Sequence, residues 1–169
     1  MQVWNGAIYG VWLVGNAFFR SADYYGAYSH SVLDRLLTLF PETPRLHLFS
    51  GMVCDPDAVR FDINAECEPD VVGDVVDLAS YFPPRHFGVV LADPPYDAKA
   101  CSAYGTRPFC KRLALKQVAR VLRPGGMLAW LDVRTPIWSK REWQWAGLIG
   151  LHQGTNRRIL GLSMLRRKR

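Results

Sequence analysis

The sequence lacks several patterns that identify whole classes of protein. It has no run of about eighteen uncharged apolar residues, so a membrane-spanning helix is not expected. The apolar stretch Ala7–Phe19 has neither a basic lead-in nor a small-residue cleavage site, which argues against a secretory signal peptide. We therefore expect a cytoplasmic protein with no membrane partner.

Cysteine patterns are equally sparse. The four cysteines, Cys54, Cys67, Cys101 and Cys110, form no CxxC pair and have no histidine at ligand spacing. This distribution argues against a structural zinc site and against a disulfide framework. We expect reduced thiols with structural roles and no metal.

The sequence also has no internal repeat, low-complexity tract or linker that would divide it. With 169 residues, 49% of them hydrophobic, it can bury a core of its own. We expect a single domain over residues 1–169. Residues 1–44 would form a helical extension, and residues 45–169 would form the core.

What the sequence does have is an excess of positive charge. Lys and Arg number 21 against 15 Asp and Glu, which gives a formal net charge of +6. Part of the excess lies at Arg157, Arg158 and the terminal residues 166–169. Such a balance suits a polyanionic partner such as nucleic acid, although a basic tail is also a common solvated end.

Apolar periodicity predicts an α/β fold. Ser31–Phe40 and Leu113–Leu122 have the spacing of amphipathic helices. Seven short runs rich in apolar residues predict strands, and their alternation with helices or loops predicts an open, mainly parallel sheet that ends in an antiparallel hairpin. These runs are 45–51, 58–62, 70–74, 87–92, 127–131, 146–151 and 158–165.

Polar groups follow four of the predicted strands. In an open parallel sheet, ligands bind outside the carboxyl ends of the strands, where Phe49-Ser50-Gly51, Asp62, Asp74 and Asp93 would lie. One aspartate after a strand is often only a turn former or a helix cap. Three in successive units after a glycine loop favour a nucleoside cofactor, with one carboxylate for the ribose hydroxyls and another for the adenine.

Asp93-Pro94-Pro95-Tyr96 is the most specific motif. The two prolines stiffen the loop and remove amide donors, so the Asp93 carboxylate and the Pro94 carbonyl can form a fixed pair of acceptors. Two such acceptors would hold both hydrogens of an exocyclic NH2 group, and Tyr96 offers a flat face on which an extruded base can stack. A rigid surface turn would explain the prolines, but not the strand before them or the aromatic residue after them.

The order of these motifs, followed by Val121-Leu-Arg-Pro-Gly-Gly126 before a strand, resembles class I amino-methyltransferases over residues 45–165, in particular DNA adenine-N6 and cytosine-N4 methyltransferases. The resemblance implies a Rossmann-like domain that binds S-adenosylmethionine. It also implies a role for each matching position. Phe49, Ser50 and Gly51 would line the methionine end, Asp62 would contact the ribose and Asp74 the adenine, and Asp93, Pro94, Pro95 and Tyr96 would hold the target amine.

The chain departs from that family in its cofactor half. Val53 stands where a second glycine is usual, and only about eleven residues separate Gly51 from Asp62. This is too few for a full crossover helix. We therefore expect shortened crossovers in the cofactor half.

No segment remains for a separate target-recognition domain, so loops would have to contact the nucleic acid. The candidates are Asp97–Pro108 and Thr135–Trp145, the second being rich in tryptophan. The alternative is that the tryptophans pack on the sheet. The cations expected to contact nucleic acid are Arg134, Lys140, Arg141, Arg157 and Arg158. We also expect relaxed specificity, a homo-oligomer or a partner subunit that supplies recognition.

These observations together predict methylation of an exocyclic amine of a nucleic-acid base, with adenine N6 in DNA preferred. The amine itself is the nucleophile, and the chain has no Pro-Cys dipeptide of the cytosine-C5 kind. One alternative is methylation of RNA, at adenine N6 or guanine N2. The other is an inactive methyltransferase-like subunit that binds nucleic acid or a partner.

Overall fold

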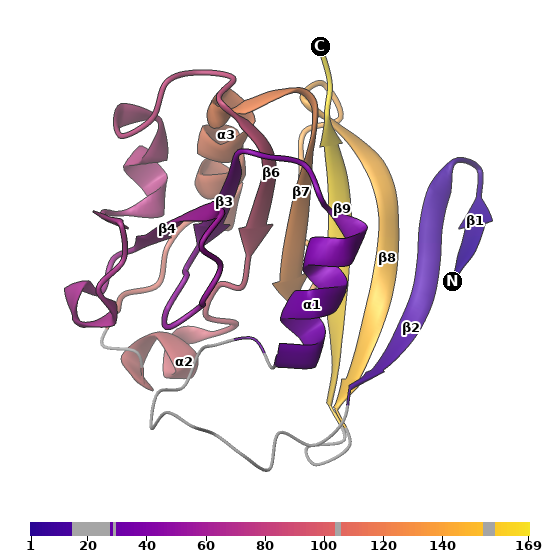
Figure 1. Cartoon of the computed structure of the whole chain (residues 1–169), viewed down its shortest axis with the longest axis horizontal. Helices are drawn as coiled ribbons and strands as arrows, with labels where there is room; N and C mark the ends of the chain where they lie inside the picture. Colours follow the sequence, from indigo (N-terminus) through magenta and orange to yellow (C-terminus); the bar gives the residue numbers. More distant parts are fainter. Residues whose placement is uncertain (15–27, 29, 104–105, 154–157) are drawn as a thin grey trace.

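A computed structural model describes residues 1–14, 28, 30–103, 106–153 and 158–169. All the described strands belong to one nine-stranded sheet, whose order is β1-β2-β8-β9-β7-β6-β3-β4-β5 (Figure 1). The strands are β1 (Gln2–Trp4), β2 (Ala7–Val14), β3 (Arg45–Leu48), β4 (Ala58–Asp62), β5 (Val71–Val72), β6 (Phe87–Ala92), β7 (Leu122–Asp132), β8 (Trp143–Gln153) and β9 (Arg158–Arg167). The helices are α1 (His30–Leu39), α2 (Ala98–Ala103) and α3 (Lys111–Val121), with 3-10 turns η1 (Ala65–Cys67) and η2 (Val75–Ser80).

The sheet is mainly parallel, as predicted. Neighbours run parallel from β7 through β6, β3 and β4 to β5, and β2 also runs parallel to β8. The predicted hairpin is present as β8 and β9, and β9 is antiparallel to both β8 and β7. The carboxyl ends of β3, β4, β6 and β7 therefore lie along one edge of the sheet.

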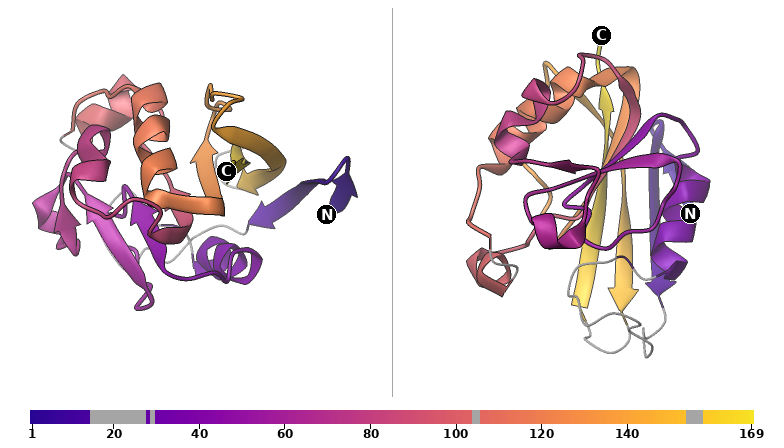
Figure 2. Two further views of the ribbon diagram at one scale, coloured as in Figure 1. Left: turned by 90° about the horizontal axis from the view of Figure 1, so that it is seen from above. Right: turned by 60° about the vertical axis from the view of Figure 1, so that its left-hand side comes forward.

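Helices cover the two faces of this sheet (Figure 2). One apolar cluster joins α3 to the sheet through Leu115 and Val118, which pack with Leu46, Leu128 and Trp130. A second cluster lies on the opposite face and joins α1 to the sheet. Its members include Val32, Leu36, Phe40, Leu91, Leu131 and Ile149. The helical periodicity of the sequence corresponds to these two buried stripes.

The N-terminal region differs from the helical extension expected over residues 1–44. It does contain α1, but it begins with two strands, so the sheet has nine strands where seven were predicted. In β2, Trp12 and Val14 are buried in the α1-side cluster, whereas Val11 and Leu13 are exposed. That alternation with period two is the signal of a strand, and pairing with β8 satisfies its backbone.

The short crossovers of the cofactor half are confirmed. Residues 49–57, between β3 and β4, contain no helix, and only η1 lies between β4 and β5. The full crossover comes after β6, where α2 and α3 lead to β7 (Figure 1). No helix in the described part of the chain is long and apolar enough to cross a membrane.

Candidate active site

A cleft, partly open to solvent, lies at the carboxyl edge of β3, β4 and β6. Eight of the nine residues predicted to hold the cofactor or the amine line it, and Ser50 does not. The lining residues are Phe49, Gly51, Phe61, Asp62, Ile63, Gly73, Asp74, Val75, Asp93, Pro94, Pro95, Tyr96, Thr106, Arg107 and Phe109.

The glycine loop is fixed to the end of β4. The Gly51 amide donates to Oδ2 of Asp62 at 2.8 Å, and the Asn64 amide donates to Oδ1 at 2.9 Å. Gly51 has a φ of +48°, a conformation that favours glycine. Each Asp62 oxygen keeps a second lone pair, so the carboxylate can still accept hydrogen bonds from a diol.

Ser50 lies behind this loop and not in the cleft. Its side chain is buried, and its Oγ has no hydrogen-bond partner among the described residues. The Ser50 amide donates to the Phe61 carbonyl, so the residue joins the loop to β4 through its backbone.

Asp74 is already engaged at both carboxylate oxygens. Oδ1 accepts from the Val76 amide and caps η2, while Oδ2 lies 3.2 Å from a guanidinium nitrogen of Arg107. Arg107 itself is highly exposed, so this ion pair crosses the rim of the cleft. A ligand that donates to Asp74 would share it with Arg107 or displace Arg107.

Asp93 follows the last residue of β6 and is partly buried. The Tyr96 hydroxyl donates to its Oδ1 at 2.8 Å, which folds the motif back on itself. The pKa of Asp93 is raised to about 7: burial raises it most, the Tyr96 hydrogen bond lowers it in part, and the charge of Asp132 contributes a smaller increase. Asp93 therefore changes between neutral and charged forms near physiological pH.

Tyr28 lies close to this motif and packs against the α1-side cluster. Burial, together with the nearby charge of Asp93, holds the pKa of Tyr28 well above its usual value of 10.0. The phenol is thus neutral and adds no negative charge of its own beside Asp93. Apart from Tyr28 and the backbone of His30, residues 24–30 lie outside the described part of the chain.

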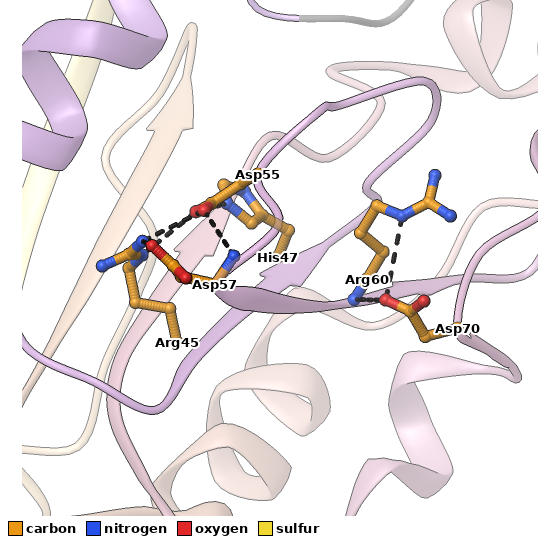
Figure 3. A network of polar contacts seen from close by, with 6 residues as sticks. All are labelled: Arg45, His47, Asp55, Asp57, Arg60 and Asp70. Atoms are coloured by element: carbon orange, nitrogen blue, oxygen red, sulfur yellow. Dashed lines mark hydrogen bonds and ion pairs between the residues drawn. The ribbon is translucent and has the colours of Figure 1, made fainter.

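A buried ion pair takes the structural place of the missing crossover helix between β3 and β4. Arg45 on β3 binds Asp55 with two hydrogen bonds of 3.0 Å, and His47 Nε2 lies 3.0 Å from the same carboxylate (Figure 3). Burial alone would raise the pKa of Asp55, but the hydrogen bonds from Arg45 and His47 outweigh it and lower that pKa. These bonds anchor the loop that carries Gly51 against the sheet.

Polar contacts of Arg60 likewise hold the short connection between β4 and β5. The Arg60 amide donates to Asp70 at 2.7 Å (Figure 3). The Arg60 guanidinium also donates to the Glu68 carbonyl. Both contacts attach the C-terminal part of the segment between β4 and β5 to β4. These polar contacts hold the short segment against the sheet, as helix packing does in longer crossovers.

The residues predicted to contact nucleic acid do not form one patch. Arg134 follows β7 at the same edge as Asp93 and is exposed. Lys140 and Arg141 precede β8. The first residue of β8 pairs with Arg167 of β9, and the neighbouring Arg166 pairs with Met127 in β7, ahead of the carboxyl end of that strand. Lys140 and Arg141 therefore lie at the edge of the sheet opposite Asp93. Arg157 and the side chain of Arg158 lie outside the described residues.

The tryptophans of the loop Thr135–Trp145 pack against other protein side chains, as in the alternative to nucleic-acid contact. Trp143 is 1% exposed in the core, and Trp138 and Trp145 stack on each other with ring centroids 5.1 Å apart. Both rings pack against the α3-side cluster. Each of these two rings thus covers one face of the other.

Several lining residues were not predicted as cofactor contacts. Ile63 and Val75 directly follow Asp62 and Asp74, so the aspartate positions could have indicated them. Thr106 and Arg107 lie in the loop predicted for target recognition, and Phe109 follows it. The Phe109 ring lies 5.1 Å from that of Phe49, which only the tertiary structure could reveal.

No family model matches the sequence, and a search of curated proteins finds none similar enough to match. Solved structures do match the fold. TrmN from Thermus thermophilus aligns over 79% of this chain with 17% identity and a TM-score of 0.58. The N-methyltransferase NodS from Bradyrhizobium japonicum WM9 aligns over 83% of this chain and 94% of its own length, with 12% identity and a TM-score of 0.53.

The chain spans about half the length of TrmN, 47% of that protein. In the part of the chain that the structure describes, no group of His, Cys, Asp and Glu side chains is arranged to hold a metal ion. The strand order and the parallel core with its antiparallel hairpin indicate the same fold class as the two structural matches. The chain therefore has the Rossmann-like α/β fold of the methyltransferase type.

Proposed function

We propose that this protein is an S-adenosylmethionine-dependent methyltransferase that acts on an exocyclic amino group of a nucleic-acid base, adenine N6 in DNA being the preferred target. One observation carries the proposal. The Asp93–Tyr96 motif lines the same cleft as Phe49, Gly51, Asp62 and Asp74. An amine site thus adjoins a site suited to a nucleoside.

The residues of the cleft fit the proposed cofactor. Asp62 offers acceptors for the two ribose hydroxyls, and Ile63 and Val75 offer apolar surface for an adenine. Gly51 carries no side chain that would fill the loop. When bound, S-adenosylmethionine supplies the methyl group.

The chain's own contribution is to bind and orient the amine. An ionised Asp93 and the Pro94 carbonyl would accept its two hydrogens and turn its lone pair toward the methyl donor. The Tyr96 hydroxyl already occupies one Asp93 oxygen, which leaves Oδ2 for the amine. Catalysis would then come mainly from positioning and from stabilising positive charge that develops on nitrogen.

The decisive experiment measures transfer of a tritiated methyl group from S-adenosylmethionine into duplex DNA, single-stranded DNA and RNA. Mass spectrometry of the digested nucleosides then identifies the modified base. We expect N6-methyladenine in DNA. Methylated adenine or guanine in RNA alone would replace DNA by RNA, and the absence of a methylated base in all three polymers would contradict the proposal.

Asp93→Ala should abolish methyl transfer and leave cofactor binding largely intact, because the carboxylate holds the amine. Asp57→Ala is the matched control, since Asp57 is 78% exposed and does not line the cleft. Methyl transfer retained by the Asp93 variant would refute its assignment.

The inactive alternative predicts a different result. A methyltransferase-like subunit without activity would fail to bind S-adenosylmethionine in calorimetry, alone and with nucleic acid present. The loop anchored by Asp55 and the continuous cleft favour binding. A homo-oligomer or a partner subunit that supplies recognition remains part of the proposal, because the predicted cations are dispersed.

A further inference from the structure

A stripe of positive charge runs along the exposed side of α3. Arg112, Lys116 and Arg120 are exposed and follow one another at intervals of four residues. Four residues advance a helix by about 6 Å, so the three cations share one side of the helix over about 12 Å. The helix contains no acidic residue, and no described residue forms a hydrogen bond or an ion pair with these three side chains. Like charges at this spacing repel one another, so the stripe costs the helix some stability.

A groove lies between α3 and the loop that precedes β8. Of the described residues that line it, Arg112 and Lys116 are basic and Glu142 alone is acidic. Leu115 and Ile137 add apolar surface, and Ile137 is 81% exposed. Cations beside apolar surface suit a nucleic-acid strand, whose phosphates bind the cations while its sugars and bases contact the apolar side chains.

The groove adjoins the cleft at the start of α3. Phe109 lines the cleft, and the next residue, Cys110, lines the groove and precedes the first turn of the helix. Lys111 donates to Asp132 at the end of β7, and β7 pairs with β6, which leads to Asp93. A strand that lies in the groove can therefore continue into the cleft.

The far end of the stripe lies beside two of the cations that were predicted to contact nucleic acid. The Arg167 guanidinium donates to the Ala119 carbonyl at 2.8 Å and to the Glu142 carbonyl at 3.0 Å. These two bonds join the last turn of α3 to the loop that carries Lys140 and Arg141. The stripe thus connects the rim of the cleft to basic residues at the opposite edge of the sheet.

Building on the proposed function, we propose that the exposed side of α3 and the groove beside it hold the phosphate backbone of the nucleic acid whose base enters the cleft. Lys and Arg side chains gain affinity by displacing counterions from phosphates. A stripe of about 12 Å spans about three to four nucleotides of a strand, at about 3.4 Å for each. Phosphate contacts fix the position and orientation of the polymer but do not read its sequence, so this surface supports relaxed specificity.

The test is fluorescence anisotropy of labelled DNA and RNA, single-stranded and duplex, over a series of salt concentrations. Lys116→Gln should weaken binding about equally for all sequences and lower the slope of log Kd against log salt by about one. The triple variant Arg112→Gln, Lys116→Gln, Arg120→Gln should lower it by about two to three. Arg35→Gln is the matched control, because it removes one exposed positive charge from α1 on the opposite face of the sheet. Equal slopes for Lys116→Gln and Arg35→Gln would overturn the inference.

Cys110 provides a second readout that reports position. Its thiol is exposed and lines the groove, whereas the exposed Cys54 does not line it. Bound nucleic acid should slow alkylation of Cys110, followed by mass spectrometry, in the wild type but not in the triple variant. Protection of Cys54 with Cys110 left unprotected would place the polymer elsewhere and overturn the inference.

These two assays separate the inference from the proposed function, because neither requires methyl transfer. Salt-dependent binding through α3 in a protein that methylates none of the polymers would support the surface and contradict the proposed function. Methyl transfer that is unaffected in the triple variant at low polymer concentration would support the function and overturn the inference. Tight binding of polyglutamate without binding of any nucleic acid would assign the surface to an acidic protein and overturn it as well.

Discussion

Replacing Asp93 by Asn should stabilise the folded protein at pH 8 even as it removes activity. The pKa of Asp93 in the folded state is about 7, against an ordinary value of 3.8. Because the folded-state value is the higher one, the unfolded chain loses this proton first, and wild-type stability falls as the pH rises from about 4 to about 7. Asn has no proton to lose, so the variant lacks this decline.

The size of the effect follows from the same two values. A difference of about three pH units corresponds to about 4 kcal/mol at 1.36 kcal/mol per unit. Asp93 is only partly buried, so water and small movements of the loop reduce that figure, and we expect about 2 kcal/mol above pH 7. The Asn side chain still offers an oxygen to the Tyr96 hydroxyl, so the variant keeps that hydrogen bond.

The assay is urea unfolding of both proteins at half-unit steps from pH 4 to pH 8. The difference in free energy of unfolding should be small near pH 4, grow up to about pH 7 and then stay constant. A difference that does not change with pH would show that folding does not raise the pKa of Asp93. That result would contradict the effects of burial and charge described for the amine site.

The remaining predictions concern the ion pairs that hold the cleft. Asp55→Ala should lower the free energy of unfolding by about 3–5 kcal/mol, because it removes both hydrogen bonds of the buried Arg45 guanidinium and leaves it only the 3.9 Å contact with the exposed Asp57. Asp57→Ala should cost less than about 0.5 kcal/mol in the same urea experiment, and equal losses for the two variants would contradict the special role of Asp55. Arg107→Ala should barely change stability and should tighten S-adenosylmethionine binding severalfold in calorimetry, because it frees Asp74; weaker binding would show that Arg107 contacts the cofactor itself.

Local signals in the sequence were enough for much of the fold and for most of the cleft. The strand at Phe87–Ala92 and the helix near Leu113 follow from continuous apolar runs and helical spacing, because burial of these side chains depends on periodicity alone. The positions of Asp62, Asp74 and Asp93 at one edge follow from the parallel arrangement, since successive parallel strands end at the same edge.

Features that depend on contacts between residues distant in the sequence were decided only by the tertiary structure. The β2 strand becomes part of the sheet because β8 pairs with it, and residues 8–14 and 147–153 are far apart along the chain. Lys140 and Arg141 lie away from the cleft because β8 starts at the opposite edge. In the same way, the pKa of Asp93 depends on burial and on Asp132, two conditions that exist only after β6 and β7 have paired. The sequence by itself thus determined which chemical groups meet at the cleft, and the assembled sheet decided their charge, their neighbours and which surfaces remain free.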